Sequence, residues 1–171
     1  VTGVQTCALP ISELRRKSAN AEARCAAVWV LFRLGSTQAL AEIRAALADS
    51  AVEVRIAAAQ AVGLAGDRAA LDALHAMVKQ DQPPVRREAA TALGRIGDTH
   101  SNGPLITAAA RAADRFEEHA ITYALIQNFS RLTNQNAGTA SAQLPNLHPR
   151  SAKAALLAFD QMEGKIGRAH V

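Results

Sequence analysis

A 31-residue internal repeat is the strongest constraint on the fold of this chain. Three segments align without a gap, namely ARCAAVWVLFRLGS at 23–36, VRIAAAQAVGLAGD at 54–67 and VRREAATALGRIGD at 85–98. Tandem copies at such a period are typical of repeat architectures, in which each unit buries its apolar face only against its neighbours. We therefore expect a stack of similar units, of which the sequence contains about four to five.

Each copy carries the same marks at equivalent positions. They are Arg24, Arg55 and Arg86; Gly35, Gly66 and Gly97; and Ser36, Asp67 and Asp98. A third step of 31 lands on FEEHAITYALIQNF at 116–129. There the apolar pattern persists, but the arginine and the Gly-Asp pair are lost.

The apolar spacing predicts two helices in each unit. In the second helix of the middle copy, apolar residues recur three and four apart at Val54, Ala57, Ala58, Ala61, Val62 and Ala65, which is one stripe of a 3.6-residue helix. Gly66 is expected to end this helix in the left-handed conformation, and Asp67 to cap the next one. The partner helices are expected at about 37–48, 68–79 and 104–113, and the predicted fold class is all-α.

Composition supports a helical stack and excludes several other classes. Hydrophobic residues make up 49% of the 171 residues, aromatic residues 4%, and 39 residues are alanine; closely packed helix pairs need such small side chains. The formal net charge is +4. This composition excludes a disordered tail, and no apolar run approaches the roughly 20 residues of a membrane span.

The two ends of the sequence match a translated sequencing adapter. VTGVQTCALPI, residues 1–11, is one reading frame of a common adapter, and IGRAHV, residues 166–171, is encoded by its reverse complement. Such segments are excluded before fold reasoning. We therefore interpret residues 12–165 as the native part, a fragment of a larger bacterial protein from a metagenome. One of the two cysteines, Cys25, then remains.

The pattern VRxxAxxALGxxGD resembles the second helix of the HEAT repeat, in the short form also called phycobilisome-lyase-type. This resemblance implies a right-handed α-solenoid of helix pairs that binds protein or neighbouring domains. We expect HEAT-like repeats at 12–129, a loop or linker at 130–149, and a helix of a degenerate further repeat at 150–165.

A narrower resemblance comes from ADRFEEHAITYALIQ at 113–127 and AALLAFDQM at 154–162. Both are similar to the HEAT stretch of large bacterial membrane-bound dehydrogenases with a c-type haem domain. The fragment itself has no CxxCH motif, so no cofactor is expected in it, although the parent protein would carry haem. The location would then be periplasmic, and otherwise cytoplasmic.

The three arginines allow two interpretations. An Arg row could attract phosphates, or each Arg could pair with an Asp or a carbonyl of the loops between helices, as HEAT repeats generally do at this position. Asp49 and Asp81 lie six and five residues before Arg55 and Arg86. We favour the structural role, and nucleic acid is not an expected partner because acids are interleaved and no aromatic platform is evident.

Few other residues suggest chemistry. Glu117, Glu118 and His119 are adjacent, so they point in different directions and do not form a helical metal pair. HEAT-type hydroxylases use repeated His-Glu pairs, and no His-Glu dipeptide occurs here. No metal site, catalytic residue or cofactor-binding residue is predicted, and Cys25 is expected to be a packing residue. The prediction is therefore that the chain is not an enzyme.

Two aromatic residues stand where the other copies have small or polar ones. Trp29 corresponds to Gln60 and Thr91, and Phe32 to Gly63 and Gly94. They are candidates for a partner-binding patch, or they pack against an upstream repeat, which we favour. Tyr123 and Phe129 are expected to be core or neighbour contacts.

The leading hypothesis is a non-catalytic scaffold for interactions between proteins or domains. One alternative is a spacer within a haem-containing dehydrogenase. The other is a HEAT-fold enzyme, such as a chromophore lyase or a DNA glycosylase. The oligomeric state is not predicted.

Overall fold

The computed structural model describes residues 11–131 and 148–160, and every regular element in this part is helical. Residues 11–17 form a first helical segment. Apart from Ile11, the expected adapter-derived ends lie outside the described residues, as does most of the expected linker at 130–149. The elements that follow are α2 (Ala21–Leu34), α3 (Thr37–Ala46), α4 (Val52–Ala65), η1 (Arg68–Ala70), α5 (Leu71–Gln80), α6 (Pro83–Ile96), η2 (Thr99–Ser101), α7 (Asn102–Ala109), α8 (Arg115–Phe129) and α10 (Pro149–Asp160).

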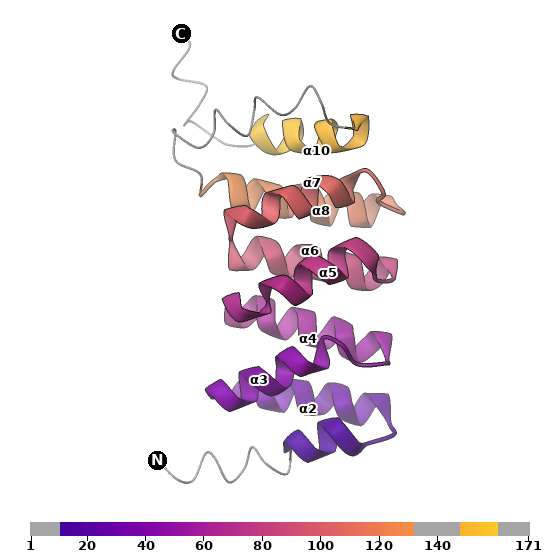
Figure 1. Cartoon of the computed structure of the whole chain (residues 1–171), viewed down its shortest axis with the longest axis vertical. Coiled ribbons are helices and arrows are strands. Elements are labelled where there is room, and N and C mark those ends of the chain that lie inside the picture. Colours follow the sequence, from indigo (N-terminus) through magenta and orange to yellow (C-terminus); the bar gives the residue numbers. More distant parts are fainter. Residues whose placement is uncertain (1–10, 132–147, 161–171) are drawn as a thin grey trace.

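The helices form two layers of a stack (Figure 1). Helices α2, α4, α6 and α8 pack side by side in one layer. Helices α3, α5 and α7 form the other layer, and each packs against the helix that follows it. Helix α10 packs on both α7 and α8 at the far end. The predicted α-solenoid of helix pairs is confirmed.

Glycines end the second helix of three successive units. Gly35, Gly66 and Gly97 follow α2, α4 and α6 with φ of 61°, 64° and 72°. Each donates its N–H back to a carbonyl of the helix that it ends. An L side chain is disfavoured at such φ values, because its Cβ clashes with the backbone.

The partner helices differ from their predicted bounds at several ends. Helix α3 stops at Ala46 instead of residue 48, because the next amides make shorter three-residue bonds, such as Leu47 N–H to the Arg44 carbonyl. The second partner begins as the 3-10 turn η1 and becomes α-helical only at Leu71. The third begins at Asn102 and ends at Ala109, again through a three-residue bond, from Arg111 N–H to the Ala108 carbonyl.

The core includes buried residues of both layers, and α4 and α6 are covered on several sides. In α4 the predicted stripe is buried except for Ala65, which is exposed in the last turn. Ala59 and Gly63 are buried as well, because α4 packs against α2, α3 and α6. The single stripe that was predicted is therefore too narrow for a helix in the middle of a stack.

Glycine sets the distance between neighbouring helices of this layer. A Cβ built on Gly63 would lie 2.8 Å from the Cα atom of Ala92 in α6. A Cβ on Gly94 would lie 2.7 Å from the Cα atom of Ala124 in α8. The backbones thus approach more closely than any side chain at these two positions allows.

The fourth unit is shifted by one residue from the predicted register. Gly63 and Gly94 are 31 apart, whereas the alanines that they face, Ala92 and Ala124, are 32 apart. The continued step of 31 was therefore wrong for α8. In the corrected register Tyr123 matches Thr91, and buried Glu117 takes the place of buried Val85.

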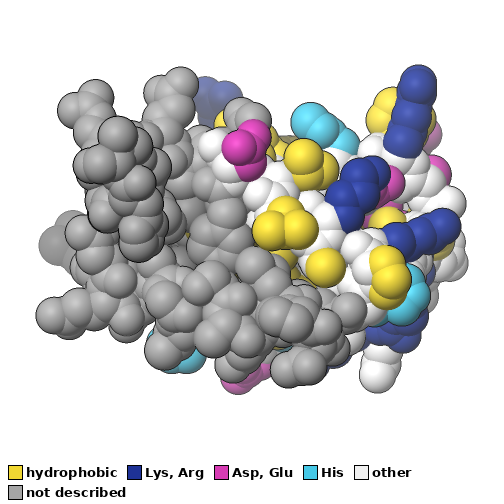
Figure 2. All heavy atoms as spheres, turned by 90° about the horizontal axis from the view of Figure 1, so that it is seen from above, with side chains coloured by type: hydrophobic (Ala, Val, Ile, Leu, Met, Phe, Trp, Pro, Cys, Tyr) yellow, Lys and Arg dark blue, Asp and Glu magenta, His cyan; other side chains and the backbone are white. Residues whose placement is uncertain are grey.

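The end of the stack at α10 exposes hydrophobic side chains. Figure 2 shows this end with yellow side chains beside Lys and Arg, partly behind residues drawn in grey. Leu156 and Leu157 of α10 are 55% and 43% exposed. Among the described helices, none has the length and hydropathy that are needed to cross a membrane.

Candidate functional site

The repeated arginines join each unit to the next through ion pairs. Every one of the three uses Nε and Nη2 to donate to both oxygens of a carboxylate in the following unit. All six side chains are between 2% and 18% exposed. The pairs are Arg24–Asp49, Arg55–Asp81 and Arg86–Glu117, with shortest N–O distances of 2.8, 2.7 and 2.6 Å.

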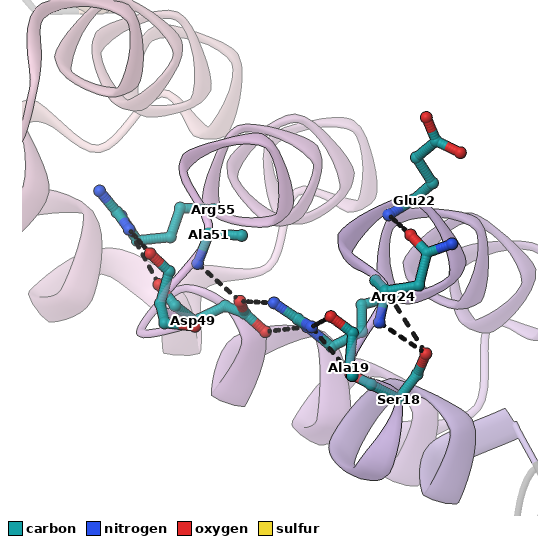
Figure 3. Close-up of polar contacts among 9 residues, drawn as sticks. Ser18, Ala19, Glu22, Arg24, Asp49, Ala51 and Arg55 are labelled. Carbon is teal, nitrogen blue, oxygen red and sulfur yellow. Dashed lines mark hydrogen bonds and ion pairs between the residues drawn. The ribbon is translucent and has the colours of Figure 1, made fainter.

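The remaining guanidinium nitrogen binds the loop before the arginine's own helix. Arg24 donates from Nη1 to the carbonyls of Ser18 and Ala19, at 2.8 and 3.2 Å (Figure 3). Arg55 repeats this arrangement with the carbonyl of Asp49 at 2.9 Å. The Asp49 carboxylate, by contrast, binds Arg24 and not Arg55. Each arginine therefore binds a backbone carbonyl in the loop before its own helix and a side-chain carboxylate in the next unit.

These contacts fix the charge state of the carboxylates. Burial alone would raise the pKa of Asp49, but hydrogen bonds from Arg24 and from the Ala51 N–H outweigh it and lower the pKa below its usual value. The pKa of Asp81 is lowered in the same way, with burial again opposed by Arg55. Because the arginines are already paired, this row offers few free donors to a phosphate.

The aspartates after the glycines cap helices and bind a second set of arginines. Asp67 accepts from the Ala69 N–H at 3.1 Å and from Arg44 Nη1 at 2.6 Å. Asp98 accepts from the His100 N–H at 3.2 Å and lies 3.7 Å from Arg68. Both carboxylates thus link helix ends of adjacent units.

Glu117, Glu118 and His119 are adjacent in sequence, but their side chains contact different partners. Glu117 is 2% exposed and holds Arg86. Glu118 binds Lys153 of α10 at 2.8 Å, and this bond lowers its pKa. His119 stacks on Tyr123 with ring centroids 6.4 Å apart. In the described part of the chain, no group of three or more His, Cys, Asp or Glu side chains could hold a metal ion.

Trp29 and Phe32 lie against the chain's own core. Their rings meet edge to face, 5.9 Å apart, and both side chains are half-buried against the hydrophobic cluster. Nearby Cys25 is also half-buried, and burial raises the pKa of its thiol. A raised pKa disfavours the reactive thiolate.

A groove lies on the surface between α6 and α8. Its volume is about 630 Å³, within the range of ordinary ligand sites. Helix α6 contributes Arg87, Glu88 and Thr91, and helix α8 contributes Arg115, Phe116, His119, Ala120 and Tyr123. These residues come from the first part of each helix, before the close approach of Gly94 to Ala124.

The groove displays aromatic surface that the fold does not bury. Phe116 is 56% exposed and Tyr123 is 52% exposed. Tyr123 is therefore not a core residue, although its ring contacts the neighbouring His119, whereas Phe129 is 1% exposed as a core residue. Exposed aromatic rings beside charged groups are typical of recognition surfaces.

Sequence reasoning missed this groove because of the shift in α8. In the corrected register Tyr123 belongs to the same column as Trp29, Gln60 and Thr91. Trp29 already marks this column as one that carries an aromatic residue, so the signal was present in the sequence. The extra residue before α8 concealed it, and Phe116 and Arg115 had no counterpart among the three matched copies.

Comparisons with known proteins agree with this architecture. A family model described as HEAT repeats matches residues 9–84 and 47–126. A solved structure of human deoxyhypusine hydroxylase in complex with glycerol superposes with a TM-score of 0.58 at 19% identity, covering 94% of this chain and 64% of that one. The chain thus spans less than two thirds of that protein, and at this identity the similarity shows the fold alone. No curated protein matches.

One prediction from the sequence is contradicted by this comparison. The chain was predicted not to be an enzyme, because no catalytic motif was found. Deoxyhypusine hydroxylase is an enzyme with HEAT-like repeats. A HEAT-like stack therefore does not exclude catalysis.

Proposed function

Because the chain belongs to the HEAT-repeat family, we propose that it is a helical scaffold that binds a protein segment in the groove between α6 and α8. HEAT repeats commonly mediate protein interactions, and stacked units offer extended binding surfaces. The observation that carries the proposal is the exposure of Phe116 and Tyr123 on the α8 wall of a groove of about 630 Å³.

The two exposed rings can contribute binding energy. Burying an aromatic ring removes apolar area worth about 25 cal/mol per Å², and aromatic residues dominate binding energy at interfaces. The groove walls belong to two helices that pack closely together at Gly94 and Ala124. A preformed groove lowers the ordering cost of binding.

Selection from a random peptide library displayed on phage tests this function. The chain is expected to enrich binders, and the double variant Phe116→Ser, Tyr123→Ser should lose them. Leu64→Ser is the matched control, because Leu64 is 53% exposed on α4 and does not line the groove. If no peptides are enriched, or if the double variant binds as well as the control, the proposal fails.

We further propose a narrower assignment, in which the chain is the connecting HEAT stretch of a haem-containing dehydrogenase. The support is the similarity of residues 113–127 and 154–162, which correspond to most of α8 and α10. Sequencing the flanking DNA tests it. A downstream CxxCH codon pattern is expected, and flanking sequence with neither CxxCH nor a propeller region would remove the assignment.

A further inference from the structure

The groove between α6 and α8 combines exposed aromatic rings with exposed positive charge. Arg115 has its guanidinium carbon 4.9 Å from the centroid of the Phe116 ring. Among the residues that the structure describes, no carboxylate lies within ion-pair distance of Arg115. A cation held over an aromatic face remains available to an incoming anion on its other side.

The second cation comes from the opposite wall. The side chain of Arg87 on α6 is 44% exposed, and its Nε lies 3.6 Å from Glu88, too far for a strong hydrogen bond. Glu88 instead accepts from Gln60 at 3.1 Å. Arg87 is thus weakly engaged, in contrast to its neighbour Arg86, which is bound on both sides.

Two acidic groups beside this groove, Asp114 and Glu118, are bound within the chain. Asp114 caps α8 by accepting from the N–H groups of Phe116 and Glu117, both at 2.8 Å. Glu118 is bound to Lys153. Glu88, the carboxylate that lines the groove, is 15% exposed and lies 3.6 Å from Arg87, which is 44% exposed. The exposed charge on the two walls is therefore mainly that of Arg87 and Arg115, and the formal net charge of the whole chain, +4, has the same sign.

We propose that the occupant of this groove is an acidic peptide segment that also carries an apolar side chain. The apolar side chain lies between Phe116 and Tyr123, and carboxylates of the segment pair with Arg87 and Arg115. This inference rests on the proposed function and specifies its ligand. Complementary charge at the rim sets partner choice and on-rate, while the aromatic rings supply most of the affinity.

A nucleic acid fits these observations less well. Single strands are bound by a continuous cationic track with aromatic platforms for successive bases. Here the next arginine along the stack, Arg55, is locked in its pair with Asp81, and Gln60 and Glu88 adjoin the groove instead of cations. Two arginines on facing walls match a short acidic segment better than an extended phosphate backbone.

Fluorescence anisotropy with three matched peptides tests the ligand class. The first alternates Glu with Leu and Phe, and the other two replace every Glu with Gln or Lys. The acidic peptide is expected to bind at least about tenfold more tightly than the Gln peptide, and its binding should weaken with added salt. A labelled single-stranded oligonucleotide is titrated in parallel.

Charge-reversal variants test whether Arg87 and Arg115 bind the acidic peptide. Arg87→Glu together with Arg115→Glu should abolish the preference for the acidic peptide and favour the Lys peptide. Arg95→Glu is the matched control, because Arg95 is exposed on the same helix outside the groove. Circular dichroism and urea midpoints verify that all variants fold.

Three other results would overturn one or both proposals. Equal binding of the acidic and Gln peptides, lost in the variant Phe116→Ser, Tyr123→Ser, would overturn the acidic ligand and leave the scaffold function standing. Tighter binding of the oligonucleotide than of any peptide would overturn the peptide in favour of nucleic acid. Failure of all three peptides and of the library selection would overturn both proposals.

Discussion

At Gly66 the effect of backbone strain can be measured without a packing clash. A methyl group added there would meet no atom within 4 Å, but φ is +64°. Gly66→Ala should therefore lower the free energy of unfolding by about 1 kcal/mol through the left-handed cap alone. Gly103→Ala is the control: it also has open space but lies within α7 without a positive φ. That change should raise stability by up to about 1 kcal/mol. Urea midpoints that move in the same direction would contradict this assignment.

The ion pairs between units make the stability of the fold depend on pH. The pKa of Asp81 is lowered in the folded state, so the unfolded chain binds more protons and folding is favoured above the ordinary Asp pKa of about 3.9. This contribution is lost as pH falls through the lowered folded pKa. Asp81→Asn should be less stable at neutral pH and should lose less stability than the parent on acidification below about pH 5. Parallel stability curves for the two proteins would contradict the bridge.

At the scale of helices, the close contact of α6 with α8 depends on Gly94. A Cβ there would lie 2.7 Å from the backbone of Ala124, so Gly94→Ala must push the helices apart. We expect a loss of about 1–3 kcal/mol from overpacking. Thermal unfolding measures it, again with Gly103→Ala as the control. A neutral or stabilising effect of Gly94→Ala would show that the two helices are farther apart than described.

The sequence predicted the helix pairs well because their determinants are local. Apolar spacing located α4 and α6, and glycines located the ends of α2, α4 and α6. The ends of the partner helices were predicted less well. Hydrogen bonds between residues three apart after Ala46 and Ala109 end these helices before their apolar pattern ends.

The binding groove could not be predicted for a different reason. It depends on the register of α8, which the loop before this helix shifts by one residue, and on the space between two helices. Neither has a local signature. The sequence also did not reveal that Glu117 binds Arg86 through both carboxylate oxygens. In the other two units the equivalent position is Val54 or Val85, and all three side chains are buried.

At the scale of the whole molecule, each unit is expected to interact only with its neighbours. Leu31 in α2 and Leu125 in α8 are both fully buried, and α4 and α6 lie between their helices. Each change to Ala should cost about 2–5 kcal/mol. In the double variant Leu31→Ala, Leu125→Ala the two costs should add to within about 0.5 kcal/mol. Chemical denaturation of the four proteins measures this, and a coupling above about 1 kcal/mol would contradict a nearest-neighbour stack.

The central claim is that recognition takes place on facing walls of α6 and α8. Chemical-shift mapping of backbone amides by NMR, during titration with a peptide selected from the library, tests it most directly. The account predicts that the largest shifts cluster at Arg87, Thr91, Phe116 and Tyr123, with little change in α3 and α5. Shifts concentrated instead on α3 and α5, or at the exposed end formed by α10, would contradict it.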